Sequence, residues 1–183
     1  MTREEALDSI KTNVENGNLI KHMLATEAVM QTLAKHFSED EEEWGLTGLL
    51  HDIDTELTHG DMQTHSKLGA DLAKEMGASE AVVHAILCHN EAHGVPRESK
   101  LDKALFCADP LTGLIIAAAL VRPDKKLASL ETRSVIKKFK QKGFAAGVHR
   151  EHITLCSEIG IEFDRFIEMG LTAMKAIADD LEL

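Results

Sequence analysis

Three short strings place metal-binding side chains at separate points of the chain. His22 lies within a helix-like apolar pattern, His51 and Asp52 follow the leucines of GLLHDID, and Asp109 lies in ALFCADPLTGL. Imidazole and carboxylate groups together suit iron, manganese, zinc or magnesium. Two histidines and two carboxylates leave positions open on a six-coordinate ion for water and for a substrate oxygen. An ion bound in this way would lower the pKa of that water and polarise the substrate.

The order of these residues and their flanks resembles the HD superfamily of metal-dependent phosphohydrolases, and within it an uncharacterised bacterial branch. GLLHDID is similar to the central motif of that family, FCADPLTG to its closing aspartate motif, and KHMLATEAVM to the helix with its first histidine. A lone His-Asp pair arises often by chance, so the prediction rests on agreement at three places. The resemblance covers residues 19–121 and implies that the metal ligands are His22, His51, Asp52 and Asp109.

Two further histidines fit an extended form of this pattern. His65 in THSKLGADLA and His89 in AILCHNE are similar to histidines that some branches place on a second ion, bridged by Asp52, or around the substrate phosphate. Asn90 stands where some dinuclear branches have another histidine. The alternative for both histidines is a helix cap or a polar niche. Asp54 is a candidate acceptor for a ligand histidine, or simply a polar residue at a helix end.

The other histidines are expected to lie outside the site. His84 is interpreted as structural and His93 as an exposed loop residue, while those interpreted as surface residues are His36, His59, His149 and His152. The segment 123–142 holds most of the basic residues, and Lys137 and Lys138 within it either belong to a solvated helix face or bind phosphate.

The elements that must position these residues are helices. Helical apolar spacing recurs along the chain, tyrosine is absent and aromatic residues make up 4%, whereas alternating strand patterns are nearly missing. We therefore expect an all-α fold: an HD-type helical bundle over 19–121 with additional C-terminal helices over 123–183, forming one domain from 1 to 183. Pro110 predicts a kink or break directly after Asp109, because proline lacks a backbone donor and clashes with the preceding turn.

Charge and composition narrow the classes of function. The chain has 183 residues and a formal net charge of -11, which argues against non-specific nucleic-acid binding. Three widely spaced cysteines predict buried thiols in a reducing compartment. The polar N-terminal segment is untypical of a signal peptide, and the longest apolar run, Leu111 to Val121, is too short to span a bilayer. These features favour a cytoplasmic protein that binds neither membrane nor nucleic acid.

The resemblance implies a hydrolase that cleaves a phosphate ester or anhydride of a nucleotide-like small molecule with a metal-activated hydroxide. Its cofactor would be a divalent transition metal (iron, manganese or zinc), as one ion or two. Two alternatives remain open: an HD-type di-iron oxygenase, and a non-catalytic HD sensor that binds a ligand. The C-terminal helices are expected to cover the site, to complete the bundle or to form a homodimer interface.

Overall fold

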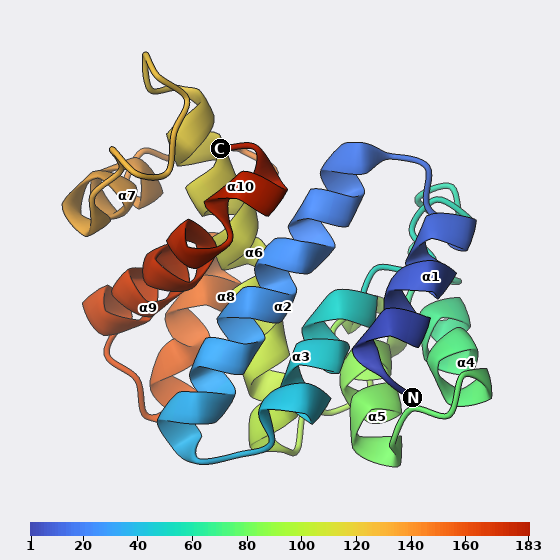
Figure 1. The fold of residues 1–183 in the computed structure, drawn as a ribbon. Coiled ribbons are helices and arrows are strands. Elements are labelled where there is room, and N and C mark those ends of the chain that lie inside the picture. The colour runs from blue at the N-terminus through green and yellow to red at the C-terminus, as the bar shows by residue number, and fades with distance from the viewer.

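The computed structural model describes residues 1–183 and is entirely helical, as predicted (Figure 1). Its α-helices are α1 (Arg3–Asn13), α2 (Gly17–Phe37), α3 (Glu41–Leu50), α4 (Lys67–Glu75), α5 (Glu80–Cys88), α6 (Lys100–Leu120), α7 (Thr132–Phe139), α8 (Arg150–Thr154), α9 (Phe163–Ala176) and α10 (Ala178–Leu181). Two 3₁₀ turns, Glu91–His93 and Leu155–Ile159, follow α5 and α8. Helices α7 to α10 are the additional C-terminal helices that the sequence predicts.

The sequence predicted a kink or a break at Pro110. The break is wrong, because α6 continues through that residue. Most of α6 is buried among other helices, and tertiary packing outweighs the single backbone hydrogen bond that proline removes. The Thr112 hydroxyl donates to the Asp109 carbonyl oxygen over 2.8 Å. Asp109 therefore faces its neighbours from an intact helix turn and not from an irregular backbone.

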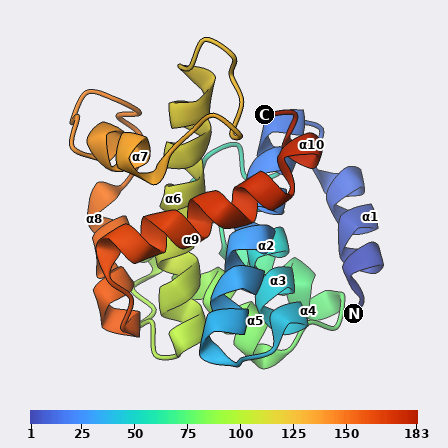
Figure 2. The ribbon, with the colours of Figure 1, turned by 60° about the vertical axis from the view of Figure 1, so that its left-hand side comes forward.

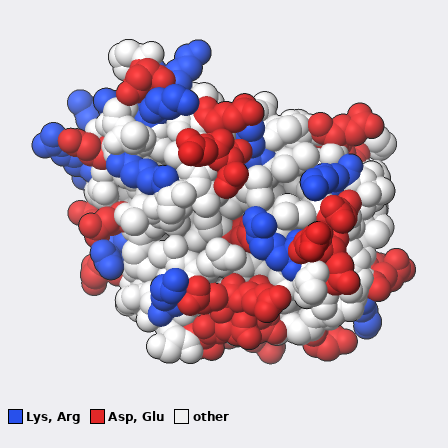
Figure 3. Space-filling model, in the orientation of Figure 1, with Lys and Arg blue, Asp and Glu red and all other residues white.

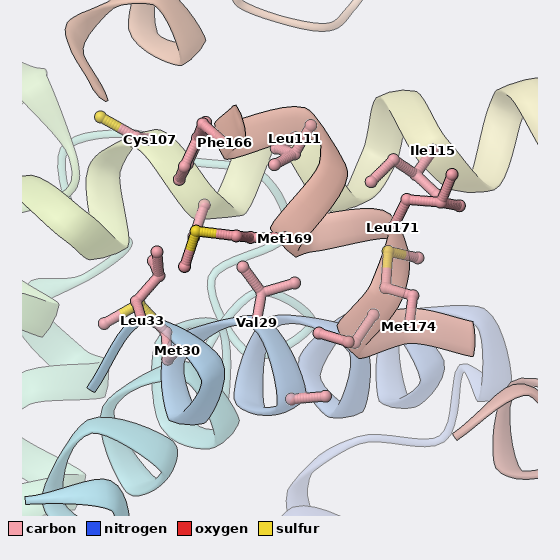
Figure 4. Close-up of a cluster of buried hydrophobic side chains, with 14 of the residues drawn as sticks. Val29, Met30, Leu33, Cys107, Leu111, Ile115, Phe166, Met169, Leu171 and Met174 are labelled. Atoms are coloured by element: carbon pink, nitrogen blue, oxygen red, sulfur yellow. The ribbon is translucent and has the colours of Figure 1, made fainter. Parts of the chain in front are cut away.

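The larger apolar core lies where α9 crosses α2 and α6, which Figure 2 shows from the side. Val29 of α2, Leu111 of α6, and Phe166 and Met174 of α9 are buried in this core (Figure 4). Burying side chains of this size stabilises a fold by about 1.5–3 kcal/mol each. The C-terminal helices therefore hold in place the two helices that carry His22 and Asp109.

A smaller core joins α1, α3, α4 and α5 on the other side of the molecule. Ile10, Leu49, Ile53 and Ile86 are completely buried there. The α2–α3 pair is unusually close, since a Cβ on Gly48 would lie 2.7 Å from the backbone oxygen of Thr26. This close approach brings the C-terminal end of α3, where His51 lies, against the first half of α2.

One helix, α6, is long and apolar enough to cross a membrane. However, 67% of its most apolar stretch is buried by the surrounding helices. Its apolar character is therefore also that of a central core helix. Cys88, Cys107 and Cys156 are buried and unpaired, as predicted. Burial raises the pKa of the Cys107 thiol to about 12.

Charged side chains are unevenly spread over the surface. Figure 3 shows acidic residues gathered at the lower edge, where α2 ends and α3 begins, and lysines and arginines at the left beside α7. Asp40 and the acidic first turn of α3 contribute to the acidic edge. Asp40 also caps α3, accepting hydrogen bonds from the Glu42 and Glu43 amides, as acidic residues at helix starts commonly do.

Candidate metal centre

Six side chains from separate parts of the chain converge in two adjacent groups. One group contains His22, His51 and Asp109, the other Asp52, His65 and His89, and the ligand atoms within each group lie within 4.8 Å of one another. They come from α2, the end of α3 and the turn that follows it, the turn before α4, the end of α5, and the middle of α6. These are the residues that the sequence singles out.

Asp52 lies between the two groups and presents one carboxylate oxygen to each. Its Oδ2 is 3.6 Å from His22 Nε2 and 3.5 Å from His51 Nε2. Its Oδ1 is 3.5 Å from His65 Nε2 and 3.6 Å from His89 Nε2. A carboxylate in this position can bridge two cations, so the arrangement can hold a second ion as well as a first.

Asp109 completes the first group from the opposite helix. Its Oδ1 is 3.1 Å from His22 Nε2 and 3.8 Å from His51 Nε2. The two Nε2 atoms are only 3.2 Å apart. Ligand atoms around a small divalent ion lie at about this spacing when their bonds to the metal are about 2.0–2.2 Å long.

The opposite ring nitrogen of every one of these histidines has an acceptor. The Nδ1 contacts are His51 to the Gly48 carbonyl at 2.8 Å, His89 to the Ile86 carbonyl at 2.6 Å, His65 to Asp54 Oδ1 at 2.9 Å, and His22 to Thr112 Oγ1 at 3.0 Å. An Nδ1–H that donates to such a partner leaves a lone pair on Nε2. Four Nε2 lone pairs then face two carboxylates, which is the donor set of a metal centre and fits iron, manganese or zinc.

Asp54 is the buried acceptor that orients His65. Its Oδ2 accepts the backbone N–H groups of Ser66 at 2.7 Å and Gly69 at 2.8 Å, while Oδ1 accepts from the imidazole. Ser66 has a φ of 72°, an uncommon conformation for a residue with a side chain. Asp54 thus secures the turn that directs His65 inward.

Thr112 orients His22, a role that was not predicted from the sequence although the residue lies within FCADPLTG. Because its hydroxyl hydrogen goes to the Asp109 carbonyl, its oxygen is left to accept from His22 Nδ1. The residue is completely buried. Its place in that motif, one helical turn after Asp109, is the sequence signal that could have indicated a role.

Opposite charges stabilise one another within the first group. Burial opposes the charged form of His22, but its hydrogen bond and charge interaction with Asp109 raise the pKa above the usual value. Burial also opposes ionisation of the two aspartates. Nevertheless, the nearby histidines hold the pKa of Asp52 and of Asp109 well below the usual range. Both carboxylates are therefore ionised and available to a cation.

A cleft of about 410 Å³ opens beside the centre. It is lined by Asp52, Thr55, Thr58, Gly60, Met62, His65, His89, Asn90, Glu91, Ala92, Asp109, His149 and His152. No lysine or arginine lines it, so an anionic ligand would meet imidazoles, neutral donors and any bound cation. Lys137 and Lys138 line a different cleft, together with Arg122, and are not part of this one.

His152 corrects the sequence interpretation, because it is not a surface residue. Only 14% of its side chain is exposed, its Nε2 is 3.2 Å from Glu91 Oε2, and its ring stacks on Phe106 with centroids 4.0 Å apart. His149 stacks on its other face, with centroids 4.8 Å apart, and remains largely exposed. No motif marks these two residues, because they follow the family-like core in sequence and reach the cleft only through the fold.

The expectation of an exposed His93 is also wrong, because the residue is half-buried behind His65. Its Nε2 lies 2.6 Å from the His65 carbonyl oxygen and 3.2 Å from the side-chain nitrogen of Asn90. The same nitrogen of Asn90 contacts the Met62 and His65 carbonyls at 2.9 and 3.1 Å. At the position where some dinuclear branches have another histidine, Asn90 thus fixes the turn that carries His65.

Arg150 fixes the loop that leads to His149. Its guanidinium donates to the carbonyl oxygens of Phe139, Gln141, Phe144, Ala145 and Val148. Several charge-assisted hydrogen bonds from one planar group hold a loop more firmly than a single bond does. The wall of the cleft formed by His149 and His152 is thereby tied to α7.

Comparisons with known proteins find one matching family and several similar proteins. The family described as "HD domain" matches residues 19–119. Ribonuclease Y of Oleidesulfovibrio alaskensis is 35% identical over 96 residues, which are 52% of this chain and 18% of that protein. Ribonuclease Y of Lawsonia intracellularis is 31% identical over 115 residues, 63% of this chain and 21% of that protein. The chain thus spans about a fifth of these relatives. No solved structure gives a significant match.

Proposed function

This chain belongs to the HD domain family, a family of metal-dependent phosphohydrolases, and we propose that it hydrolyses a phosphate ester or anhydride of a nucleotide-like small molecule. In this proposal His22, His51, Asp52 and Asp109 bind one ion, and His65 and His89 bind a second ion or the substrate phosphate. The observation that carries it is the position of Asp52, with one oxygen toward each group of histidines.

A divalent ion held there supplies Lewis-acid activation of a water molecule and of a phosphoryl oxygen. The residues of the chain supply positioning. The orienting bonds on the Nδ1 atoms fix each imidazole before substrate binds, which lowers the reorganisation that the reaction requires. Thr55 lines the cleft, and its buried hydroxyl has no hydrogen-bond partner, so a rotation of this side chain would let it donate to a phosphate oxygen.

The cleft itself supports a compact substrate. Its volume of about 410 Å³ lies within the range of small-molecule sites, about 300–1,000 Å³. No lysine or arginine lines it, and the net charge of -11 disfavours long polyanions. The similarity to the proteins named ribonuclease Y makes a phosphodiester of a short RNA the next substrate to test.

The test is metal-dependent turnover. The protein, purified without chelator, would be reconstituted with iron, manganese or zinc and assayed for phosphate or nucleotide release from nucleotides, dinucleoside polyphosphates and short RNA. We expect turnover that Asp52→Asn abolishes and that Asp71→Asn, at an exposed aspartate of α4, leaves intact. Absence of turnover with every metal and substrate, from protein that binds metal, would overturn the proposal.

The same geometry favours one second candidate. Two histidine groups that share Asp52 suit two iron ions, which an oxygenase of this fold would use to activate oxygen. This candidate requires two irons per chain and substrate-dependent oxygen consumption. A protein that binds other divalent ions, releases phosphate and consumes no oxygen would exclude it.

A further inference from the structure

A second cluster of potential ligands lies outside the centre described above. His84 and Cys88 are one helical turn apart on α5, and Asp102 lies in the first turn of α6, which packs against α5. Their ligand atoms lie within 4.8 Å of one another. None of these residues is a proposed ligand of the centre described above, and none of them lines the cleft.

One oxygen of the Asp102 carboxylate is left without a partner, and this points to a ligand at the cluster. Its Oδ2 accepts the backbone N–H groups of Glu98 and Ser99 at 2.9 and 2.8 Å, and His84 Nδ1 is 3.2 Å away. Its Oδ1 is buried and has no hydrogen-bond partner, although only 1% of the residue is exposed. An unpartnered buried carboxylate oxygen is costly, and a cation would satisfy it.

From these contacts we propose that His84, Cys88 and Asp102 form a zinc-binding site separate from the catalytic centre. Nitrogen, sulfur and oxygen ligands are those zinc prefers. The 3.2 Å between His84 Nδ1 and Asp102 Oδ2 places the imidazole beside this carboxylate, at about the 3.3 Å that separates ligand atoms around tetrahedral zinc, and Oδ1 is the carboxylate oxygen still free to bind the ion. The soft thiolate disfavours magnesium and manganese.

The surroundings suit binding and entry of the ion. The two backbone N–H groups already hold the Asp102 carboxylate in place, as the outer contacts of metal ligands commonly do. His84 is 37% exposed, so an ion can enter from solvent and a water molecule can occupy the fourth position. Binding would release the Cys88 thiol proton to solvent and would join α5 to α6 next to His89.

Cobalt(II) is a probe that separates the two sites, because the catalytic centre offers no sulfur. A thiolate bound to cobalt gives a strong near-ultraviolet charge-transfer band, whereas histidine and carboxylate ligands do not. We expect this band when the full chain is titrated with cobalt, and its suppression when zinc is added in competition. Metal analysis should show one more zinc ion per chain than in the Cys88→Ser variant.

The variants decide the assignment. Cys88→Ser should abolish the band and His84→Ala should weaken cobalt binding at least tenfold, while Cys107→Ser and His36→Ala should leave both unchanged. Circular dichroism would confirm that each variant is folded. A wild-type protein that binds cobalt without the band, or a band that persists in Cys88→Ser, would overturn the proposal. Either result is independent of turnover at the catalytic centre.

Discussion

Replacing Asp54 with asparagine separates the two groups of the metal centre without touching a proposed ligand. Asp54 Oδ2 accepts two backbone N–H groups, so the amide oxygen of asparagine will take that position. The amide NH₂ must then face His65 Nδ1, which now lies 2.9 Å from Oδ1. A donor facing Nδ1 favours the tautomer with its hydrogen on Nε2, and that tautomer cannot bind a metal through Nε2.

The expected loss of metal affinity follows from the role of Asp54 as the partner that orients His65. Loss of a partner that orients a ligand histidine costs about 10–100-fold in metal affinity, or about 1.4–2.7 kcal/mol. The loss should fall on the ion bound by His65 and His89. The ion bound by His22, His51 and Asp109 should keep its affinity, because no contact of Asp54 reaches that group.

Calorimetric metal titration, with metal analysis after dialysis, would measure both affinities in wild type, Asp54→Asn and the matched control Asp71→Asn. Thermal unfolding of the metal-free proteins would show whether the variant remains folded, with an expected destabilisation of about 1–3 kcal/mol from the weakened hydrogen bonds. Two ions bound with wild-type affinity in Asp54→Asn would refute the assigned role of Asp54. Loss of the first ion alone would refute the division into two groups.

Three further predictions concern packing, pH and the cleft wall. Gly48→Ala should destabilise the protein by about 1–3 kcal/mol, measured as a lower Tm, because the new Cβ would meet the Thr26 backbone at 2.7 Å; an unchanged Tm would show that α2 and α3 can separate freely. In metal-free protein the raised pKa of His22 adds stability that is full below about pH 6.5, the unfolded pKa, and is lost as pH rises through the folded pKa. The lowered pKa of Asp109 acts in the opposite sense, adding stability above the unfolded pKa that is lost only in acid. Thermal unfolding in chelator should therefore show falling stability above about pH 6.5, and metal-loaded protein should show the reverse because protons compete with the metal; parallel profiles would contradict this. His152→Ala should raise KM about fivefold, the effect of one hydrogen bond of about 1 kcal/mol, with unchanged metal content; loss of metal instead would place His152 in the metal centre.

The strings KHMLATEAVM, GLLHDID and FCADPLTG were enough to name the candidate site, through their resemblance to the HD family. Chemistry limits which side chains can bind a metal, but the chain has ten histidines. The resemblance selected His22, His51, Asp52 and Asp109 among the possible ligands. The all-helical class follows from local signals.

The tertiary structure decided what local signals cannot encode. Pro110 predicts a kink or a break by its own chemistry, but α6 packs against α2 and α9 and continues through that residue. Thr112 and Asn90 orient other residues through contacts that depend on which helices are neighbours. Their sequence positions alone could not reveal these roles.

His152 and His149 show most clearly what the sequence cannot predict, because they are far from every motif in sequence and yet line the cleft beside Asp52. The sequence by itself determined which groups can hold a metal and that helices carry them. The resemblance offered Asp52 as a possible bridge, but only the tertiary structure decided that one of its oxygens faces each group and that C-terminal residues complete the cleft. The physical reason is that ligand chemistry belongs to each side chain, whereas distances between remote residues arise only when the whole chain packs.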